Sequence, residues 1–536
     1  MSLDLNLEDF LRWRFSRRTA LKAGVGAALS SQALLLQDLA IVPQRPALAA
    51  SFSDIQFDIG RFLTQAPSVF NDGGGNVTAQ FGPIFTMLAP ARLTRNPVRA
   101  DQTTLNNALN QIEAIYAAAP SGILIAAVAY GLPYFNRLNQ TVVRAQVPKL
   151  ASNTSRLVLE ESPVFPTDVG APGITKDRFN NRVQIETNDL FFEFRSDSTF
   201  ILNDVLTWLQ GSNSLNGKQI ASPAFNGLVQ FATPRLMFVQ MGMPRRVADS
   251  AAQSNPTLYE FHTRVNRISS MTMGFVDQQS NASAAPGDVI FASTGAGAGQ
   301  TTARPGDYFD NGAFAHLSHD IEDLYQFYAL ANQDSRHPDG EPFTERVMYM
   351  FRANQLGTTH GLPNEGNTDQ FTDGGGPSFL NNAFQGNNSV MNEARDNAGT
   401  FAPGNQTQDA TFTGLGRIGH VAGLQRFGRT SGGAPLHIRN DGPGFDPMDV
   451  GSFQLFPGGQ TIAAGSNQFK LQFLVFMPSA ELFRQMRVGV AAQDLQTQFG
   501  VDEDDNGLER FITATRRQNF LVPPRRHRAF PLLELQ

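Results

Sequence analysis

The chain has 536 residues, of which 41% are hydrophobic, and this is enough material for two or three ordinary domains with a real core. Its net charge of −6 argues against a nucleic-acid-binding protein, which normally shows a basic face. The absence of cysteine excludes disulfides, thiolate nucleophiles and Cys-ligated zinc or iron–sulfur clusters. Basic clusters at Arg516-Arg517 and at 525–528 are local, and we expect them to be surface groups or to pair with carboxylates.

Residues 1–50 have the pattern of an export leader, and we expect them to lie outside the fold. Residues 16–22 (SRRTALK) resemble a twin-arginine motif, residues 23–42 are largely apolar, and Ala47-Leu48-Ala49 is a small-residue cleavage pattern. A membrane anchor is the alternative, but the stretch is more polar than the ~20 apolar residues that span a bilayer. We therefore expect export of the folded chain by the twin-arginine machinery, cleavage of the leader, no membrane span in the mature chain, and a periplasmic or extracellular location.

The first half of the mature chain, residues 51–285, predicts a series of strands and helices. Apolar residues at helical spacing predict a helix from Leu105 to Tyr116, and the apolar run 123–130 predicts a buried strand. Residues 191–194 predict a second strand. Ser198 is the candidate N-cap of a helix that follows it.

The second half, residues 286–536, repeats this order. Residues 312–315 predict a strand, Asp320 is expected to open a helix, residues 469–476 predict a strand, and Pro478-Ser479 predicts a helix start. The repetition favours an α+β fold of duplicated ferredoxin-like domains, with antiparallel sheets covered by helices. The segment 356–433 is rich in Gly, Asn, Gln and Thr, and it is either a functional loop near the site or a plain surface insertion.

Two short motifs carry candidate chemistry. Gly274-Phe275-Val276-Asp277 places a carboxylate after a glycine turn, and His437-Ile438-Arg439 places an imidazole one residue from a guanidinium. A haem iron takes a neutral imidazole on one face and a proton-transfer group on the other, and cations pair with its propionates. Each motif also has an ordinary interpretation, with His437 as a structural histidine, Asp277 as a turn residue and Arg439 in a surface ion pair.

A third motif, His316-Leu317-Ser318-His319-Asp320, has a spacing that could place both imidazoles on one helical face. No third ligand accompanies the two histidines, so we expect surface residues here.

In this order, the motifs resemble those of the dye-decolourising peroxidases, from about residue 53 to the C-terminus. The landmarks are Asp54-Ile55-Gln56 for the opening strand of that family, 274–277 with Asn281 for its G-F-x-D-G segment, 310–314, the H-I-R at 437–439, and the apolar strand 471–476. The resemblance implies two ferredoxin-like domains of the dimeric α+β barrel type with haem b as cofactor. It also fits the twin-arginine leader, which secreted members carry.

The resemblance further implies a role for each matching residue. His437 would be the axial ligand through neutral Nε2, and Asp505, in the acidic run 502–505, would accept a hydrogen bond from its Nδ1, unless that run is a solvated turn. Asp277 would move the proton of hydrogen peroxide, help that is typically worth ~10²–10⁴-fold. Arg439 would pair with a propionate. The distal pocket would include Phe275, Leu471 and Phe473, the last two being equally compatible with a plain core.

Two departures from the family's pattern stand out. Gln278 replaces the glycine that closes the G-x-x-D-G segment, and no arginine lies between Arg439 and Arg484, where the family keeps a distal arginine. The distal cation is therefore missing or is supplied by another part of the chain.

We expect an exported peroxidase that uses hydrogen peroxide to oxidise a phenolic, dye-like or other organic donor. Three alternatives remain open: a non-catalytic haem-binding or haem-carrying relative, a secreted binding module that has lost haem, and the release of iron from haem. The sequence leaves the oligomeric state open.

Overall fold

The computed structural model describes residues 31–42, 53–58, 68–71, 76–79, 81–116, 122–273, 283–333, 420–447, 452–491 and 508–536, with short gaps inside these ranges. Most of the segment 356–433 and the whole of 274–282 and 501–507 therefore fall outside the described residues. Phe275, Asp277 and Asp505 are among these.

The first half builds a four-stranded antiparallel unit. Its elements in chain order are β3 (Phe85–Leu93), α4 (Arg99–Ile115), β4 (Leu124–Gly131), β6 (Leu190–Ser196), α7 (Thr199–Leu209) and β10 (Arg235–Phe238). In the sheet the strands lie in the order β10-β3-β6-β4. A β-α-β-β-α-β chain in which the first strand lies between the fourth and the third is the ferredoxin-like arrangement.

The second half repeats the same arrangement. Its elements are β11 (Ala313–Glu322), α10 (Leu324–Gln333), β12 (Ile438–Arg439), β13 (Gly442–Pro447), β16 (Asn467–Met477), α15 (Ala480–Val490) and β17 (Ile512–Val522). The strand order is β17-β11-β16-β12, with β13 continuing the edge on β16. The predicted duplication of a ferredoxin-like unit is confirmed, while the domain boundaries at residues 285 and 286 stay a prediction.

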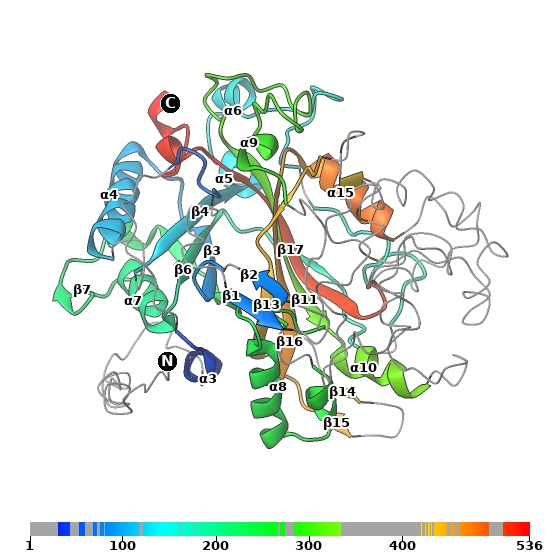
Figure 1. Ribbon diagram of the computed structural model, residues 1–536. Helices are drawn as coiled ribbons and strands as arrows, with labels where there is room; N and C mark the ends of the chain where they lie inside the picture. Colours follow the sequence, from blue (N-terminus) through cyan, green and yellow to red (C-terminus); the bar gives the residue numbers. More distant parts are fainter. Residues whose placement is uncertain are drawn as a thin grey trace.

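The two units join into one sheet. Phe520 and Leu521 of β17 pair with Gly131 and Tyr130 of β4, so the edges of the two units meet. Helices α4 and α7 cover the outer face of the first unit's strands, and α10 and α15 cover the outer face of the second unit's strands, as Figure 1 shows. The remaining described elements are shorter or peripheral: β1 (Ser68–Asn71), β2 (Asn76–Ala79), α5 (Leu132–Asn136), α6 (Gln140–Gln146), β5 (Gln184–Ile185), β7 (Ser214–Leu215), β8 (Lys218–Gln219), β9 (Val229–Phe231), α8 (Met243–Ser254), α9 (Pro286–Val289), β14 (Phe453–Gln454) and β15 (Thr461–Ile462).

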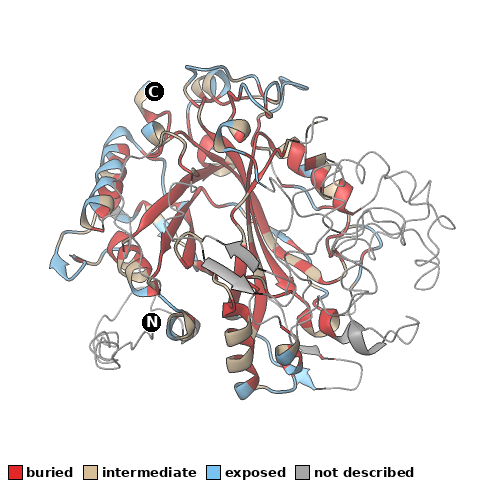
Figure 2. Ribbon diagram, viewed as in Figure 1, coloured by how far each residue is buried: buried red, intermediate tan, exposed pale blue. Residues whose placement is uncertain are grey.

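The sheet has two differently filled faces, and most residues of its long strands are buried (Figure 2). The helix-free face, which we call the inner face, carries an apolar cluster drawn from both units, including Leu88, Phe191, Leu317, Phe476 and Phe520. The helix-covered face of each unit belongs to a second and larger cluster. Because side chains alternate along a strand, each residue can be assigned to one of these faces from its position.

The two ends of the sheet approach each other. A Cβ placed on Gly444 of β13 would lie 3.1 Å from the carbonyl oxygen of Leu236 in β10, and one on Gly442 would lie 2.8 Å from Cγ2 of Val239. Glycine allows this close approach of two backbones. No hydrogen-bonded ladder joins β10 to β13 among the described strands, so the sheet curves toward a barrel without closing.

Three local predictions are corrected by the structure. Asp320 does not open a helix, because β11 continues to Glu322 and α10 begins at Leu324. Residues 54–56 form a turn and not a strand, and the side chain of Gln56 bonds Val128 and the carbonyl of Pro523 where the two units join. Ser198 precedes α7, but its side chain caps nothing.

A further difference concerns the apolar stretch of the predicted leader. Residues Ser31–Leu39 form helix α3, which packs against α7 and α8, and Leu36 is 1% exposed in the main core cluster. The expectation that all of residues 1–50 lie outside the fold is therefore wrong for this part. The twin-arginine motif lies outside the described residues, and the cut near 47–49 stays a prediction.

Candidate cofactor site

The helix-covered face of the second unit holds the residues that the sequence singles out. In β12, Ile438 belongs to the inner-face cluster, so His437 and Arg439 on either side of it point to the helix-covered face. In β16, Leu474 and Phe476 face inward, so Leu471 and Phe473 also point to the helix-covered face. The structure thus brings four of the predicted site residues to one side of one sheet.

His437 is buried, with 4% of its surface exposed. Its ring atoms Nδ1 and Cε1 both lie 3.4 Å from the position that a Cβ on Gly428 would take, and Cε of Met486 in α15 lies 3.4 Å from the same point. Glycine at 428 therefore leaves room for the imidazole beneath α15. The ring thus lies between the backbone of Gly428 and the thioether of Met486.

The strand of His437 is tied to the segment that follows Asp277. The backbone N–H of Ala284 donates to the carbonyl oxygen of His437 at 2.9 Å. Ala284 lies seven residues after Asp277, so these residues can span at most ~25 Å. The segment that begins at residue 283 is thus hydrogen-bonded to the strand of His437, whereas residues 274–277 lie outside the described part of the chain.

Leu471 and Phe473 are only partly buried, although β16 is a central strand. Their partners across the ladder on β11 are Asp320 and Ser318, which lie on the same face. On the other face, Leu474 and Phe476 are fully buried. The helix-covered face is therefore less tightly filled at Leu471 and Phe473 than the inner face is at the same level of the strand.

Acidic groups line this part of the face. The hydroxyl of Ser318 donates to the carboxylate of Asp320 at 2.7 Å, and the hydroxyl of Thr272 donates to Glu322. Burial raises the pKa of Glu322 to about 7. Burial also raises the pKa of Asp441, against the effect of the nearby Arg439. The predicted surface ion pair of Arg439 thus has a candidate anionic neighbour, and a propionate partner stays a prediction.

Two arginines near α15, the buried Arg517 and the partly buried Arg487, form ion pairs, and neither was predicted to be a site residue. Arg517 of β17 pairs with Asp168, and its guanidinium lies 4.5 Å from the ring centre of Phe165. Arg487 of α15 makes two hydrogen bonds to Glu509, of 2.7 and 2.9 Å. Burial works against ionisation of Glu509, but Arg487 outweighs it and lowers the pKa to about 2. No local sequence pattern predicts these pairs, because their members come from segments more than 20 residues apart.

The expectation for the basic clusters is confirmed in its carboxylate-pairing form. Arg525 and Arg528 both pair with Glu113, and Arg526 pairs with Asp54 and Asp310. Arg517 pairs with Asp168 as described above. These arginines hold the C-terminal segment to the body of the protein.

His316 and His319 are not surface residues, which corrects the expectation from their spacing. They lie in strand β11 with 1% and 4% of their surface exposed, and they are buried because β11 is central in the second unit. The ring of His316 stacks on Phe483 of α15 with centres 4.0 Å apart, on the helix-covered face. Among the described residues, no group of three or more His, Cys, Asp or Glu side chains could hold a metal ion.

The tautomer of His316 is fixed by Asn519. The amide nitrogen of Asn519 donates to the carbonyl oxygen of Glu160 at 2.7 Å, so its oxygen is the atom that faces Nδ1 of His316, at 2.8 Å. Nδ1 must therefore carry the proton. Burial, with a further contribution from Arg517, holds the pKa of His316 well below its usual value, so the ring is neutral.

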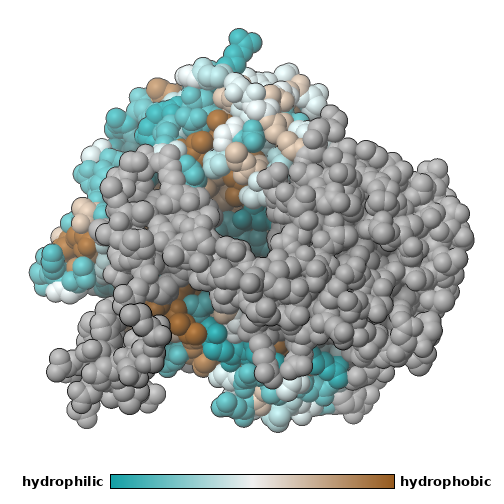
Figure 3. Space-filling model, viewed as in Figure 1, coloured by the Kyte–Doolittle hydropathy of each residue, from teal (hydrophilic) through white to brown (hydrophobic). Residues whose placement is uncertain are grey.

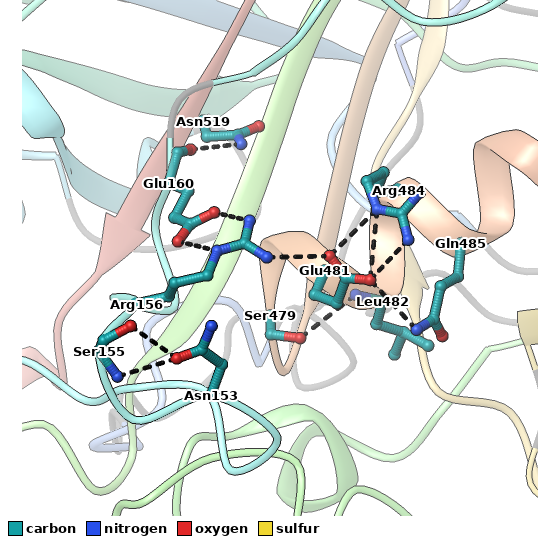
Figure 4. Close-up of polar contacts among 10 residues, drawn as sticks. All are labelled: Asn153, Ser155, Arg156, Glu160, Ser479, Glu481, Leu482, Arg484, Gln485 and Asn519. Carbon is teal, nitrogen blue, oxygen red and sulfur yellow. Dashed lines mark hydrogen bonds and ion pairs between the residues drawn. The ribbon is translucent and has the colours of Figure 1, made fainter.

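Glu160 belongs to a polar cluster at the junction of the two units (Figure 4). Arg156 pairs with Glu160, and its guanidinium also lies 3.7 Å from Glu481 in the first turn of α15. A hollow beside it is lined by Leu132, Ser155, Arg156, Leu157 and Glu160. The cluster thus connects a loop of the first unit to the helix that covers His437 and His316.

The side chains on the helix-covered face are of the types that hold a His-ligated haem. They supply one buried imidazole at His437, apolar and partly exposed side chains at Leu471 and Phe473, and a guanidinium at Arg439. The other buried imidazole of this face, His316, stacks on Phe483 and is bonded through Nδ1 to Asn519. Three further predicted site residues belong to segments that are not described: Asp277, predicted to transfer a proton, Phe275, predicted to line the distal pocket, and Asp505, the predicted partner of His437.

Comparison with known proteins gives a family match and remote structural likenesses. Residues 83–339 match DUF7405, a family of unknown function. No curated protein matches the chain. Among solved structures, a putative dyp-type peroxidase protein from Shewanella oneidensis is 13% identical with a TM-score of 0.43, covering 85% of this chain and 96% of that one.

Two further structures give similar values. A DyP-type peroxidase from Cellulomonas bogoriensis is 13% identical with a TM-score of 0.42, over 82% of this chain and 90% of that one. A dye-decolorizing protein from V. cholerae is 12% identical with a TM-score of 0.40, over 82% and 94%. The two ferredoxin-like units of this chain follow from its own strand order, independently of these likenesses.

Proposed function

We propose that the chain is a haem protein that uses hydrogen peroxide to oxidise an organic donor by one-electron steps. The observation that supports this most is the buried position of His437 on the helix-covered face, next to the partly exposed apolar residues of β16. An imidazole in such a place suits an axial ligand, because it is shielded from water.

This proposal gives a role to three residues of the chain. Nε2 of His437 holds the iron, and Arg439 pairs with a propionate. Asp277 takes a proton from one oxygen of hydrogen peroxide and returns it to the other, which leaves as water. When bound, haem would supply the redox chemistry by which two donor molecules each give one electron and one proton to a peroxide, so that each peroxide yields two waters and two donor radicals.

The distal cation bears on the second candidate function. Arg517, which is buried, and Arg487, which is partly buried, are each paired with a carboxylate in the described part of the chain. A well-placed donor can be worth ~10²–10³-fold in stabilising developing negative charge. If no cation serves peroxide, turnover is slow, and a haem-carrying protein without peroxidase activity becomes the second candidate.

The test is the absorption spectrum of haem-reconstituted protein. Wild type is expected to show a Soret band that His437→Ala weakens or shifts, while His262→Ala, which changes a half-buried histidine paired with Asp249, leaves it unchanged. A Soret band that is identical in His437→Ala and wild type contradicts the ligand assignment. A wild type without any Soret band supports a binding module that has lost haem.

Peroxide and a phenolic dye then separate the two haem-binding candidates. Turnover that falls by at least tenfold in Asp277→Asn supports the peroxidase, whereas a haem-loaded wild type without turnover supports the carrier.

We also propose that the chain is exported, on the basis of the twin-arginine motif of residues 16–22. Replacing both Arg17 and Arg18 by lysine should retain the protein inside the producing cell.

A further inference from the structure

Helix α3 is joined to the body of the protein by contacts that are specific for its sequence. Leu36 is 1% exposed and belongs to the main core cluster, and Leu35, Leu39 and Ala40 pack against the same cluster. The helix lies across α7 and α8 (Figure 1). Burying a leucine side chain typically stabilises a fold by ~1.5–3 kcal/mol.

Polar contacts fix the end of this segment. Nε of Arg246 in α8 donates to the carbonyl oxygen of Leu39 at 2.9 Å. The amide of Gln240 bonds both backbone groups of Ile41, donating to its oxygen at 2.6 Å and accepting from its nitrogen at 3.0 Å. The carbonyls at a helix C-terminus lack intrahelical partners, so Arg246 and Gln240 complete what α3 and the residues after it cannot satisfy themselves.

The body in turn depends on the segment. The side-chain oxygen of Gln37 accepts hydrogen bonds from both the N–H and the hydroxyl of Thr199, the first residue of α7, at 2.7 and 3.1 Å. Ser198 makes no such cap. The docking is therefore reciprocal, because each side satisfies polar groups of the other.

We propose that residues 31–42 are a lasting element of the folded protein, bound in a docking site on α7 and α8, and are not part of a discarded leader. A cut at Ala47-Leu48-Ala49 would separate these residues from the body, which would lose a core leucine and the cap of α7. Processing that spares the fold must therefore occur before Ser31 or not at all. This inference does not depend on haem or peroxide.

The exposed residues of the segment are apolar except for Asp38. Leu34, Ile41 and Val42 are 37%, 66% and 53% exposed, and apolar surface is visible in this region of the face shown in Figure 3. The buried and exposed leucines of α3 therefore provide a matched pair for a test, because Leu34 and Leu36 belong to the same helix and differ in burial alone.

The experiment uses the full-length chain and two readouts. Leu36→Ala is expected to lower the melting temperature by roughly 2–4 °C, and Leu34→Ala by less than about 1 °C. The intact mass of wild-type protein recovered from the producing cells, in whichever fraction it accumulates, is expected to include residues 31–42. Equal melting temperatures of the two variants overturn the proposal, and so does a folded wild type whose first residue lies beyond Val42.

Discussion

Gln37 caps a helix that begins 162 residues further along the chain: its Oε1 accepts a hydrogen bond from the backbone N–H of Thr199 at 2.7 Å. The neighbouring Ser198 is of the residue type that normally does this, yet its own side chain makes no bond to the helix. The N-terminus of α7 is thus satisfied through the tertiary structure.

The first prediction compares two residues that cap a helix with one that does not. Ser479 caps α15 by accepting from the N–H of Leu482 at 3.3 Å, so Ser479→Ala should lower the free energy of unfolding by about 1 kcal/mol. Gln37→Ala should cost a similar amount, because it removes the cap of α7. Ser198→Ala is the control and should change stability by less than about 0.5 kcal/mol. Urea denaturation measures all three, and a Ser198 variant as destabilised as the Gln37 variant would contradict the assignment.

The second prediction concerns the pair of Asn519 and His316. Asn519→Ala leaves Nδ1 of His316 and the carbonyl of Glu160 without this partner, at a cost of roughly 1–3 kcal/mol for a buried group. The loss is measured by urea denaturation. Ser155→Ala, which removes a hydrogen bond to Asn153 at the surface, serves as the control and should be nearly neutral. If both variants unfold alike, the amide does not hold the ring.

The third prediction tests the buried pair of Arg517 and Asp168. Arg517→Met should lower the free energy of unfolding by roughly 3–5 kcal/mol, because it leaves a buried carboxylate without its counter-ion. The double variant Arg517→Met with Asp168→Leu should recover at least half of the loss. Arg484→Ala breaks an exposed pair with Glu481 and should cost less than about 1 kcal/mol. A double variant that is less stable than Arg517→Met alone would refute this account.

The fourth prediction is a pH dependence that originates at Glu193. Burial on the inner face raises the pKa of Glu193 to about 7, although Arg195 and a hydrogen bond from Asn440 oppose the shift. The folded state therefore binds a proton that the unfolded state releases above its ordinary pKa of 4.5. The contribution of Glu193 to the free energy of unfolding is fully present below pH 4.5. It decreases as the pH rises through 7, by about 3 kcal/mol in total.

Glu193→Gln should remove that decrease, since the neutral amide resembles the protonated acid and keeps an oxygen for Asn440. Melting temperatures between pH 5 and pH 8 measure the effect. Glu481→Gln is the control, because Arg484 lowers the pKa of Glu481 and no decrease arises in this range. Parallel pH profiles for wild type and Glu193→Gln would show that Glu193 does not titrate as described.

Several elements followed from local patterns. The apolar run at 123–130, the helix after Ser198 and the alternating stretch at 469–476 appear as β4, α7 and β16 within a residue or two. Strand β11 was cut short in the prediction because it carries His316, Ser318, His319 and Asp320. Polar residues of this kind are uncommon in central strands. Here their polar groups bond to Asn519, to Thr515 and to one another, so the strand can continue through them.

The candidate site likewise has a part that the sequence predicted and a part that it did not. The alternation of His437, Ile438 and Arg439 placed an imidazole and a guanidinium on one face, and this depended on spacing alone. The pairing of Arg487 with Glu509 and of Arg517 with Asp168 could not be predicted, because ion pairs between distant segments leave no periodic signal in a sequence. The roles of Asp277 and Asp505 stay predictions.

By itself, the sequence determined the class of the fold and its duplication, because the period of apolar residues is set by the geometry of strands and helices. The tertiary structure alone decided which charged side chains pair, that the two edges of the sheet approach each other, and that residues 31–42 dock on α7 and α8. These outcomes depend on groups hundreds of residues apart becoming neighbours, and only the folded arrangement of the two units brings them together.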